Sequence, residues 1–119
     1  MEQNKIDTVN KRFALFMGAT VISAYSPNTI STGEIFLFTK ENAPNYCLTH
    51  GSGTLRYHLS WDWLMPVWFK FRETRHGDMQ HLHNNYCARL AQDLAYGTLE
   101  EFYHNLGIAV EWLDSLQTN

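Results

Sequence analysis

The sequence predicts one α+β domain over residues 1–119, with an N-terminal helix, a small and mainly antiparallel sheet, a central Trp-rich helix and a C-terminal amphipathic helix packed on the sheet. Three observations support this prediction. Apolar residues recur at helical spacing near both ends of the chain, and short β-branched runs lie between them. Three of the four tryptophans fall within residues 61–68, and large aromatic side chains bury enough surface to organise a core.

Composition and charge narrow the class of protein. Hydrophobic residues make up 45% of the chain, and its formal net charge is -3. The Lys and Arg residues are scattered, so nucleic acid is not an expected partner. No apolar run approaches the roughly 18 residues of a membrane span, and the polar opening does not resemble a signal peptide. We therefore expect a soluble, cytoplasmic protein with no membrane contact.

The first elements follow from apolar spacing. The periodicity predicts a helix over residues 4–17, and Gly18 suits its end because glycine adopts the left-handed backbone conformation easily. Residues 20–25 are β-branched and aromatic, which predicts a strand.

A second strand is predicted over residues 34–40. Its apolar run is unbroken over residues 35–38, which indicates a strand covered on both faces. Residues 41–54 are rich in Asn, Pro, Gly and Ser, so we expect mostly loop, with a brief strand at 46–48 as its one ordered piece.

The Trp-rich helix has two candidate N-caps, Ser60 and Asp62. With Asp62 as the cap, Pro66 lies in the first turn, where its missing N–H costs little. With Ser60 as the cap, Pro66 lies deeper in the helix and predicts a kink. In both cases the helix should run to about Thr74.

Residues 79–95 carry two conflicting signals. Apolar residues repeat every four positions, which indicates a helix. The repeat consists of Leu82, Tyr86, Leu90 and Leu94. The Asn84-Asn85 pair indicates a turn instead, with strands at 79–83 and 86–92. We take the hairpin as the expectation and the helix as the alternative.

A capping box at residues 98–101 predicts the start of the last helix, because the Thr98 hydroxyl can accept a hydrogen bond from the Glu101 backbone amide. An apolar stripe then continues through three or more turns. Its members are Leu99, Phe102, Tyr103, Leu106, Val110, Leu113 and Leu116. Gly107 costs the helix about 1 kcal/mol relative to alanine and would permit close packing on a neighbour, such as the tryptophans.

Ser, His and Asp occur together just before the Trp-rich helix, next to Tyr57. Catalytic triads are recognised by geometry, and their members are usually distant in sequence, whereas His58, Ser60 and Asp62 lie within five residues. Ser60 and Asp62 are better interpreted as helix caps, and His58 as a half-buried residue that holds a loop carbonyl. The chain contains no catalytic motif, so a binding role is favoured over an enzymatic one.

A metal site is the alternative reading. The candidate ligands are Cys47, His50, His81, His83 and Cys87. Cys47 and His50 have the spacing of a metal knuckle, and His81 and His83 would share one face of a strand. Zinc needs four such groups to converge, so the alternative function is a zinc-stabilised module or a small metal-dependent enzyme. Ordinary exposed histidines and free thiols are the simpler interpretation, and the leading prediction includes no cofactor.

Aromatic residues are the other candidates for function. The chain holds 4 Trp, 6 Tyr and 7 Phe, more than a domain of this size buries easily. Exposed aromatic side chains are frequent anchors at protein interfaces. We expect an interface that includes Trp68, Phe69, Tyr57 and Trp112. Self-association through Trp68 and Phe69 is a further expectation, which would make the protein a homo-oligomer.

Residues 57–67 read YHLSWDWLMPV. This segment resembles the YH-x-SWDWLMPV signature of small uncharacterised proteins from phage, prophage and mobile-element genes of gut bacteria. Residues 16–18, FMG, and the terminal helix closing at 110–113 also resemble the family. The resemblance implies a strand-like segment before the last helix, and it brings no activity or cofactor. The chain departs from the family at 68–71, WFKF, where the family continues with a polar helix.

The function predicted from these observations is that of a small accessory protein of phage or mobile-element origin. It would act by binding a host or phage protein.

Overall fold

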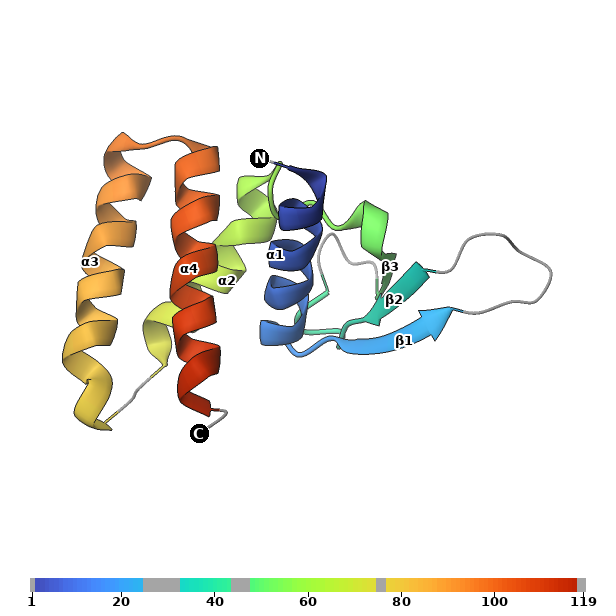
Figure 1. Cartoon of the computed structure of the whole chain (residues 1–119), viewed down its shortest axis with the longest axis horizontal. Coiled ribbons are helices and arrows are strands. Elements are labelled where there is room, and N and C mark those ends of the chain that lie inside the picture. The colour runs from blue at the N-terminus through green and yellow to red at the C-terminus, as the bar shows by residue number, and fades with distance from the viewer. Residues whose placement is uncertain (1, 25–32, 44–47, 75–76, 118–119) are drawn as a thin grey trace.

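The computed structural model describes residues 2–24, 33–43, 48–74 and 77–117, and it shows the predicted α+β fold (Figure 1). The helices are α1 (Gln3–Phe16), α2 (Trp61–Glu73), α3 (Gln80–Tyr96) and α4 (Leu99–Gln117). The strands are β1 (Thr20–Ala24), β2 (Gly33–Leu37) and β3 (Thr49–Gly51). Short 3-10 turns lie at Ser52–Thr54 and Gly77–Met79. In Figure 1, α4 lies between α3 and α1, and the sheet lies beyond α1.

The end of α1 confirms the role predicted for Gly18. This residue has a φ of 88°, and its N–H donates to the Leu15 carbonyl at 3.0 Å. The Ala19 N–H donates to the Ala14 carbonyl, also at 3.0 Å. These two bonds form a Schellman motif, which satisfies carbonyls that the helix itself leaves unpaired.

The sheet is antiparallel, in the order β1-β2-β3. Phe36 and Phe38 are buried, whereas Leu37 is exposed and Ile35 is half-buried. The expectation that residues 35–38 are covered on both faces is therefore wrong. Side chains alternate between the two faces of a strand, and in the described residues helices cover only one of them.

The expected loop over residues 41–54 contains a strand that sequence patterns did not reveal. β3 pairs with β2, and the Phe38 N–H donates to the Leu48 carbonyl at 2.8 Å. The sequence of β3, Thr-His-Gly, lacks the alternating apolar pattern that marks a strand. Of the brief strand expected at 46–48, only residue 48 falls within the described residues.

α2 begins directly after Ser60, so Ser60 and not Asp62 is the N-cap residue, although its side chain makes no capping hydrogen bond. Pro66 consequently lies inside the helix. The inner face of α2 is fully apolar, and it consists of Trp63, Leu64, Val67, Trp68 and Phe71.

The hairpin expected at residues 79–95 is wrong, because this segment forms the helix α3. The four-residue apolar repeat outweighs the turn signal of Asn84-Asn85. Both Asn side chains are exposed on the helix, where they cost little, and the Gln80 side-chain amide donates to the Asn84 carbonyl oxygen at 3.0 Å. The strand-like segment that the family resemblance implied is absent here for the same reason.

α4 is the central element of the core and contacts each of the other three helices. The Glu101 N–H donates to the Thr98 hydroxyl oxygen at 3.2 Å, which confirms the predicted cap. A β-carbon placed on Gly107 would lie 3.0 Å from Cγ1 of Val9. Gly107 therefore allows a close approach to α1, not to the tryptophans.

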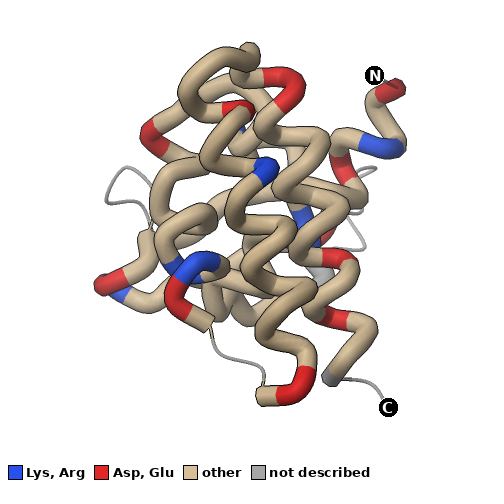
Figure 2. Tube along the Cα trace, turned by 90° about the vertical axis from the view of Figure 1, so that its left-hand side faces the viewer, with Lys and Arg blue, Asp and Glu red and all other residues tan. Residues whose placement is uncertain are grey.

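Charged residues of both signs are spread along the chain. On the face shown in Figure 2, basic and acidic positions are interspersed, and no basic stripe runs along it. Among the helices that the structure describes, none combines the length and the apolar character needed to cross a bilayer.

Candidate functional site

The exposed side of α2 carries large apolar side chains beside the polar Asp62, Lys70 and Glu73. Trp61, Met65 and Phe69 are spaced four residues apart and so lie on one side of the helix. Trp61 is 38% exposed, Phe69 is 43% exposed and Met65 is half-buried. We refer to these three residues as the α2 stripe.

Contacts with neighbouring residues restrict the aromatic members of the α2 stripe. The Trp61 ring lies 5.4 Å from the ring of Phe102 on α4, so one of its faces is anchored in the core. The Arg72 guanidinium lies 5.2 Å from the centre of the Phe69 ring, within the range of a cation–π contact. Because these side chains are already restrained, a partner would order them at a small entropic cost.

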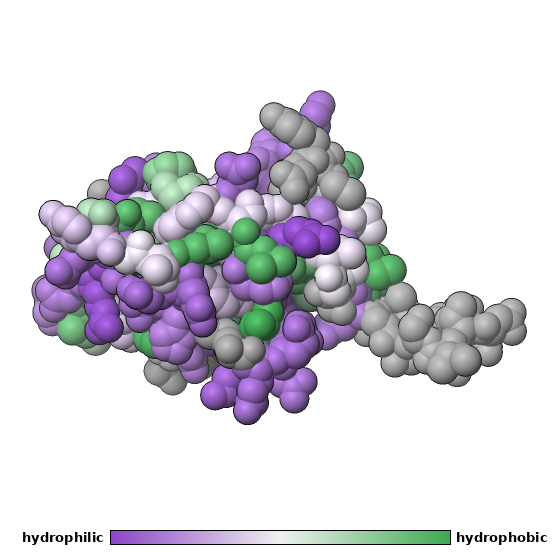
Figure 3. Space-filling view, turned by 90° about the horizontal axis from the view of Figure 1, so that it is seen from above, coloured by the Kyte–Doolittle hydropathy of each residue, from purple (hydrophilic) through white to green (hydrophobic). Residues whose placement is uncertain are grey.

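Polar groups border the α2 stripe. Exposed Asp62 lies at the N-terminal end of α2, and Arg72 lies near its C-terminal end. Lys70 is directed elsewhere, because its ammonium group donates to the Phe16 carbonyl at the end of α1. An apolar centre with a polar rim is the usual anatomy of a protein interface. On the face seen in Figure 3, apolar residues form several groups among hydrophilic ones.

The four aromatic residues predicted to form an interface occupy different environments. Trp68 and Tyr57 are buried in the core, at 4% and 1% exposure. Trp112 is half-buried, with its ring 4.9 Å from that of Tyr86. Of the four, Phe69 alone is classed as exposed, so Trp68 cannot present a surface beside it. At residues 68–71, Trp68 and Phe71 are buried and Phe69 is exposed.

Sequence reasoning missed two members of the α2 stripe. Trp61 was assigned to the core with the other tryptophans, and Met65 was not considered. The available signal was their spacing of eight and four residues before Phe69, which places all three on one helix face. The spacing applies to Trp61 only if the helix begins at this residue, and with Asp62 as the N-cap Trp61 would lie outside the helix.

Of the Ser-His-Asp segment, His58 takes part in a hydrogen-bond network with Asn10 and Tyr103. Asn10 is buried, and its amide group donates to the Leu55 carbonyl at 3.3 Å and to Nδ1 of His58 at 3.1 Å. The Tyr103 hydroxyl donates to Oδ1 of Asn10 at 2.9 Å. His58 therefore braces Asn10, and Asn10 holds the loop carbonyl that we expected His58 to hold. No hydrogen bond joins Ser60 to His58 within the part of the chain described here.

Electrostatic conditions at the network favour neutral groups. Partial burial, followed by the charge of Arg56, lowers the pKa of His58 below its ordinary value. Burial raises the pKa of the Tyr103 hydroxyl, and Asp7 raises it further. A neutral His58 can accept the hydrogen bond from Asn10 at Nδ1, so the lowered pKa and the geometry agree.

The expected metal ligands do not gather. Cys47 lies outside the described residues. His81 and His83 are two residues apart on α3, which turns them to different sides of a helix and removes the shared strand face that we expected. Among the described residues, no group of three or more His, Cys, Asp or Glu side chains is arranged to hold a metal ion.

The remaining candidate ligands lie in aromatic surroundings. Nε2 of His83 lies 2.6 Å from the Phe71 carbonyl oxygen, and Cys87 lies 3.8 Å from the same imidazole. His50 on β3 packs its ring 5.0 Å from that of Trp63. The surroundings of His83 and His50 indicate packing roles.

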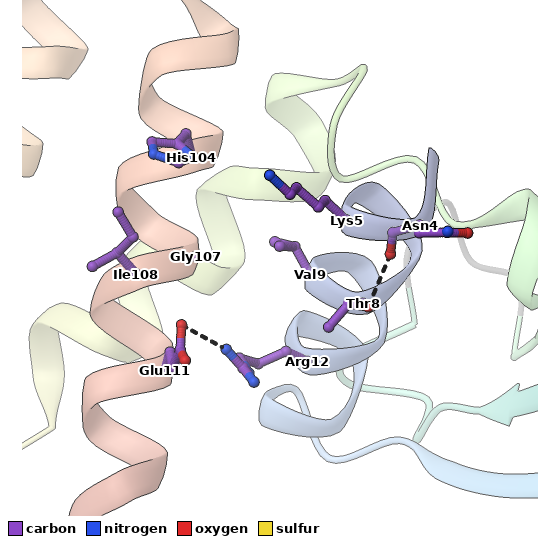
Figure 4. Close-up of a pocket in the computed structure, with 9 residues that line it drawn as sticks. All are labelled: Asn4, Lys5, Thr8, Val9, Arg12, His104, Gly107, Ile108 and Glu111. Atoms are coloured by element: carbon purple, nitrogen blue, oxygen red, sulfur yellow. Dashed lines mark hydrogen bonds and ion pairs between the residues drawn. The ribbon is translucent and has the colours of Figure 1, made fainter. Parts of the chain in front are cut away.

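A groove with a volume of about 350 Å³ lies between α1 and α4 (Figure 4). Its floor is the close contact of Val9 with Gly107, and the Arg12–Glu111 ion pair, at 3.2 Å, crosses its lower end. Nine residues line it: Asn4, Lys5, Thr8, Val9, Arg12, His104, Gly107, Ile108 and Glu111. Six of these nine residues are polar or charged.

Comparisons with protein-family models, with curated proteins and with solved structures found no match to this chain.

Proposed function

We propose that this chain is a small accessory protein of phage or mobile-element origin that acts by binding a host or phage protein through the α2 stripe. The observation that carries the proposal is the exposure of Trp61 and Phe69 on a helix whose inner face already supplies the core. Trp is strongly enriched among the residues that dominate binding energy, and clustered exposed apolar groups mark contact sites.

The spacing of the α2 stripe supports a particular form of contact. Anchors four residues apart on one helix face are the pattern by which an amphipathic helix enters an apolar groove. The partner should therefore present such a groove. The origin in phage or mobile elements is supported by the resemblance of residues 57–67 to the family signature.

The first experiment is affinity capture of the tagged protein from host lysates prepared with and without prophage induction. Captured proteins are identified by mass spectrometry, purified and titrated against the chain by calorimetry. A partner captured only after induction would support a phage target, and one captured in both lysates a host target. Failure to obtain any partner that binds in purified form would contradict the proposal.

The second experiment locates the contact. We expect Trp61→Ser and Phe69→Ser each to weaken binding by about 2 kcal/mol, which is about thirtyfold in Kd. Ile108→Ser on α4 is the matched control, because Ile108 is a similarly exposed apolar residue outside the α2 stripe. Equal losses in all three variants, or none in the first two, would remove the α2 stripe from the interface.

A further inference from the structure

Both edges of the sheet are unpaired among the described residues, and the edge at β1 is the longer of the two. β2 is paired on both sides, by β1 and by β3, so β1 and β3 are the edge strands. β3 has three residues and leads directly into a 3-10 turn, which keeps that edge short. β1 has five residues, and no described element pairs with its other edge (Figure 1).

The sequence of β1 lacks the devices that normally protect an edge strand. Monomeric proteins place a charged residue, a proline or a bulge on such edges, because an open row of N–H and C=O groups pairs readily with another strand. β1 reads Thr-Val-Ile-Ser-Ala and contains no charge, no proline and no glycine. Its pairing with β2 is continuous over all five positions, so it contains no bulge.

The outer face of the sheet adds apolar surface beside this edge. Ile22 on β1 is 47% exposed and lies opposite Ile35 on β2, which is half-buried. Leu37, opposite Thr20, is also exposed on this face. An exposed patch of aliphatic side chains next to an unprotected edge is unfavourable in water and favours association.

We propose that β1 pairs antiparallel with β1 of a second copy of this chain, about a two-fold axis at Ile22, to form one six-stranded sheet. The strand is complementary to itself, because five residues centred on Ile22 place Ile22 opposite its own copy and Thr20 opposite Ala24. No charge lies on either strand to oppose the contact. The apolar outer faces of the two sheets then become continuous, and this dimer is independent of the function proposed for the α2 stripe.

Light scattering after size exclusion tests the dimer. We expect the wild-type chain to have twice the monomer mass of 13.9 kDa, and Ile22→Lys to have the monomer mass, because a lysine at the pairing axis meets its own copy. Ile108→Lys is the matched control, since Ile108 on α4 is 45% exposed and should leave the dimer intact. Circular dichroism confirms that both variants fold. A monomeric wild-type chain, or a dimer that survives Ile22→Lys, would overturn the proposal.

Cross-linking tests the register in a background of Cys47→Ala and Cys87→Ala. Residues directly opposite in an antiparallel pair have Cα atoms about 4.5–5.5 Å apart, within the range that a disulfide spans. Mild oxidation should therefore cross-link Ile22→Cys to its own copy. Leu37→Cys, on the same face but one strand away from the edge, should remain uncross-linked. Cross-linking through Leu37→Cys alone would indicate face-to-face stacking of the sheets and would overturn edge pairing.

Discussion

The inner face of α2 and the α2 stripe on its outer side both contain tryptophan and phenylalanine, but they differ in exposure to water. On the inner face, Trp63, Val67 and Phe71 are almost completely removed from water. On the outer face, Trp61 and Phe69 keep more than a third of their surface exposed. Burial of apolar surface stabilises the fold, whereas apolar surface left in water gains nothing until a partner covers it. The inner face therefore accounts for folding, and the outer face calls for a second explanation.

The largest effect that this comparison predicts is on the inner face. Phe71 is completely buried, so Phe71→Ala should lower the free energy of unfolding by about 3–5 kcal/mol through lost transfer energy and a cavity. Urea denaturation followed by tryptophan fluorescence measures it. A loss below about 1 kcal/mol, within the range of ordinary surface substitutions, would show that α2 is not part of the core.

Substitutions in the network of Asn10, His58 and Tyr103, which lies before the N-terminus of α2, should lower stability less than Phe71→Ala. Tyr103→Phe removes the hydroxyl that donates to Oδ1 of Asn10, and it leaves that buried oxygen without this donor. We expect a loss of about 1–3 kcal/mol in the free energy of unfolding. Tyr96→Phe on the exposed end of α3 is the matched control and should change stability little. Equal effects from both tyrosines would show that the network does not contribute.

The outer face should respond in the opposite way. Phe69→Ser removes an exposed ring and the cation–π contact of Arg72, so the loss of stability should stay within about 1 kcal/mol. Thermal denaturation and circular dichroism measure this, and partner binding is measured in the same samples. If Phe69→Ser destabilised the chain as much as Phe71→Ala, the distinction between the two faces would fail.

Much of the fold follows from local patterns in the sequence. The Schellman end at Gly18 and the capping box at Thr98 were predicted because each depends on residues within one helical turn. β3 is not predicted from the sequence because it is held by pairing with β2. Its three residues alone carry no pattern that indicates this pairing. The hairpin error at residues 79–95 has the same origin: Asn84-Asn85 is a local signal, and packing of the apolar repeat against α4 decides the outcome.

The candidate site was less predictable than the fold. The sequence identified an unusual concentration of aromatics and placed Phe69 at the surface, but it could not separate Trp61 from Trp68. Trp61 and Trp68 are seven residues apart, which is nearly two helical turns, so both point in almost the same direction from α2. The position of α2 relative to α4 therefore decides which of the two tryptophans is covered. The groove between α1 and α4 depends on Val9 and Gly107, which are far apart in the chain, and no single-segment pattern relates them.

The smallest predicted effect is on the pH dependence of the free energy of unfolding, and it tests the network of Asn10, His58 and Tyr103 next to α2. The pKa of His58 is lowered in the folded chain, chiefly by partial burial, so the unfolded chain binds this proton more readily. The stability that neutral His58 contributes is present above its ordinary pKa of about 6.5 and declines as pH falls through that value toward the lowered one.

His58→Gln tests this prediction, because glutamine cannot titrate but keeps an acceptor for the Asn10 amide. The difference in unfolding free energy between wild type and this variant should shift against wild type as pH falls from about 7 to about 5. A titration midpoint for His58 above that of a free histidine, observed by NMR, would reverse the sign. It would mean that the network favours the charged ring, and that Asn10 is held by Tyr103 and the Leu55 carbonyl without His58.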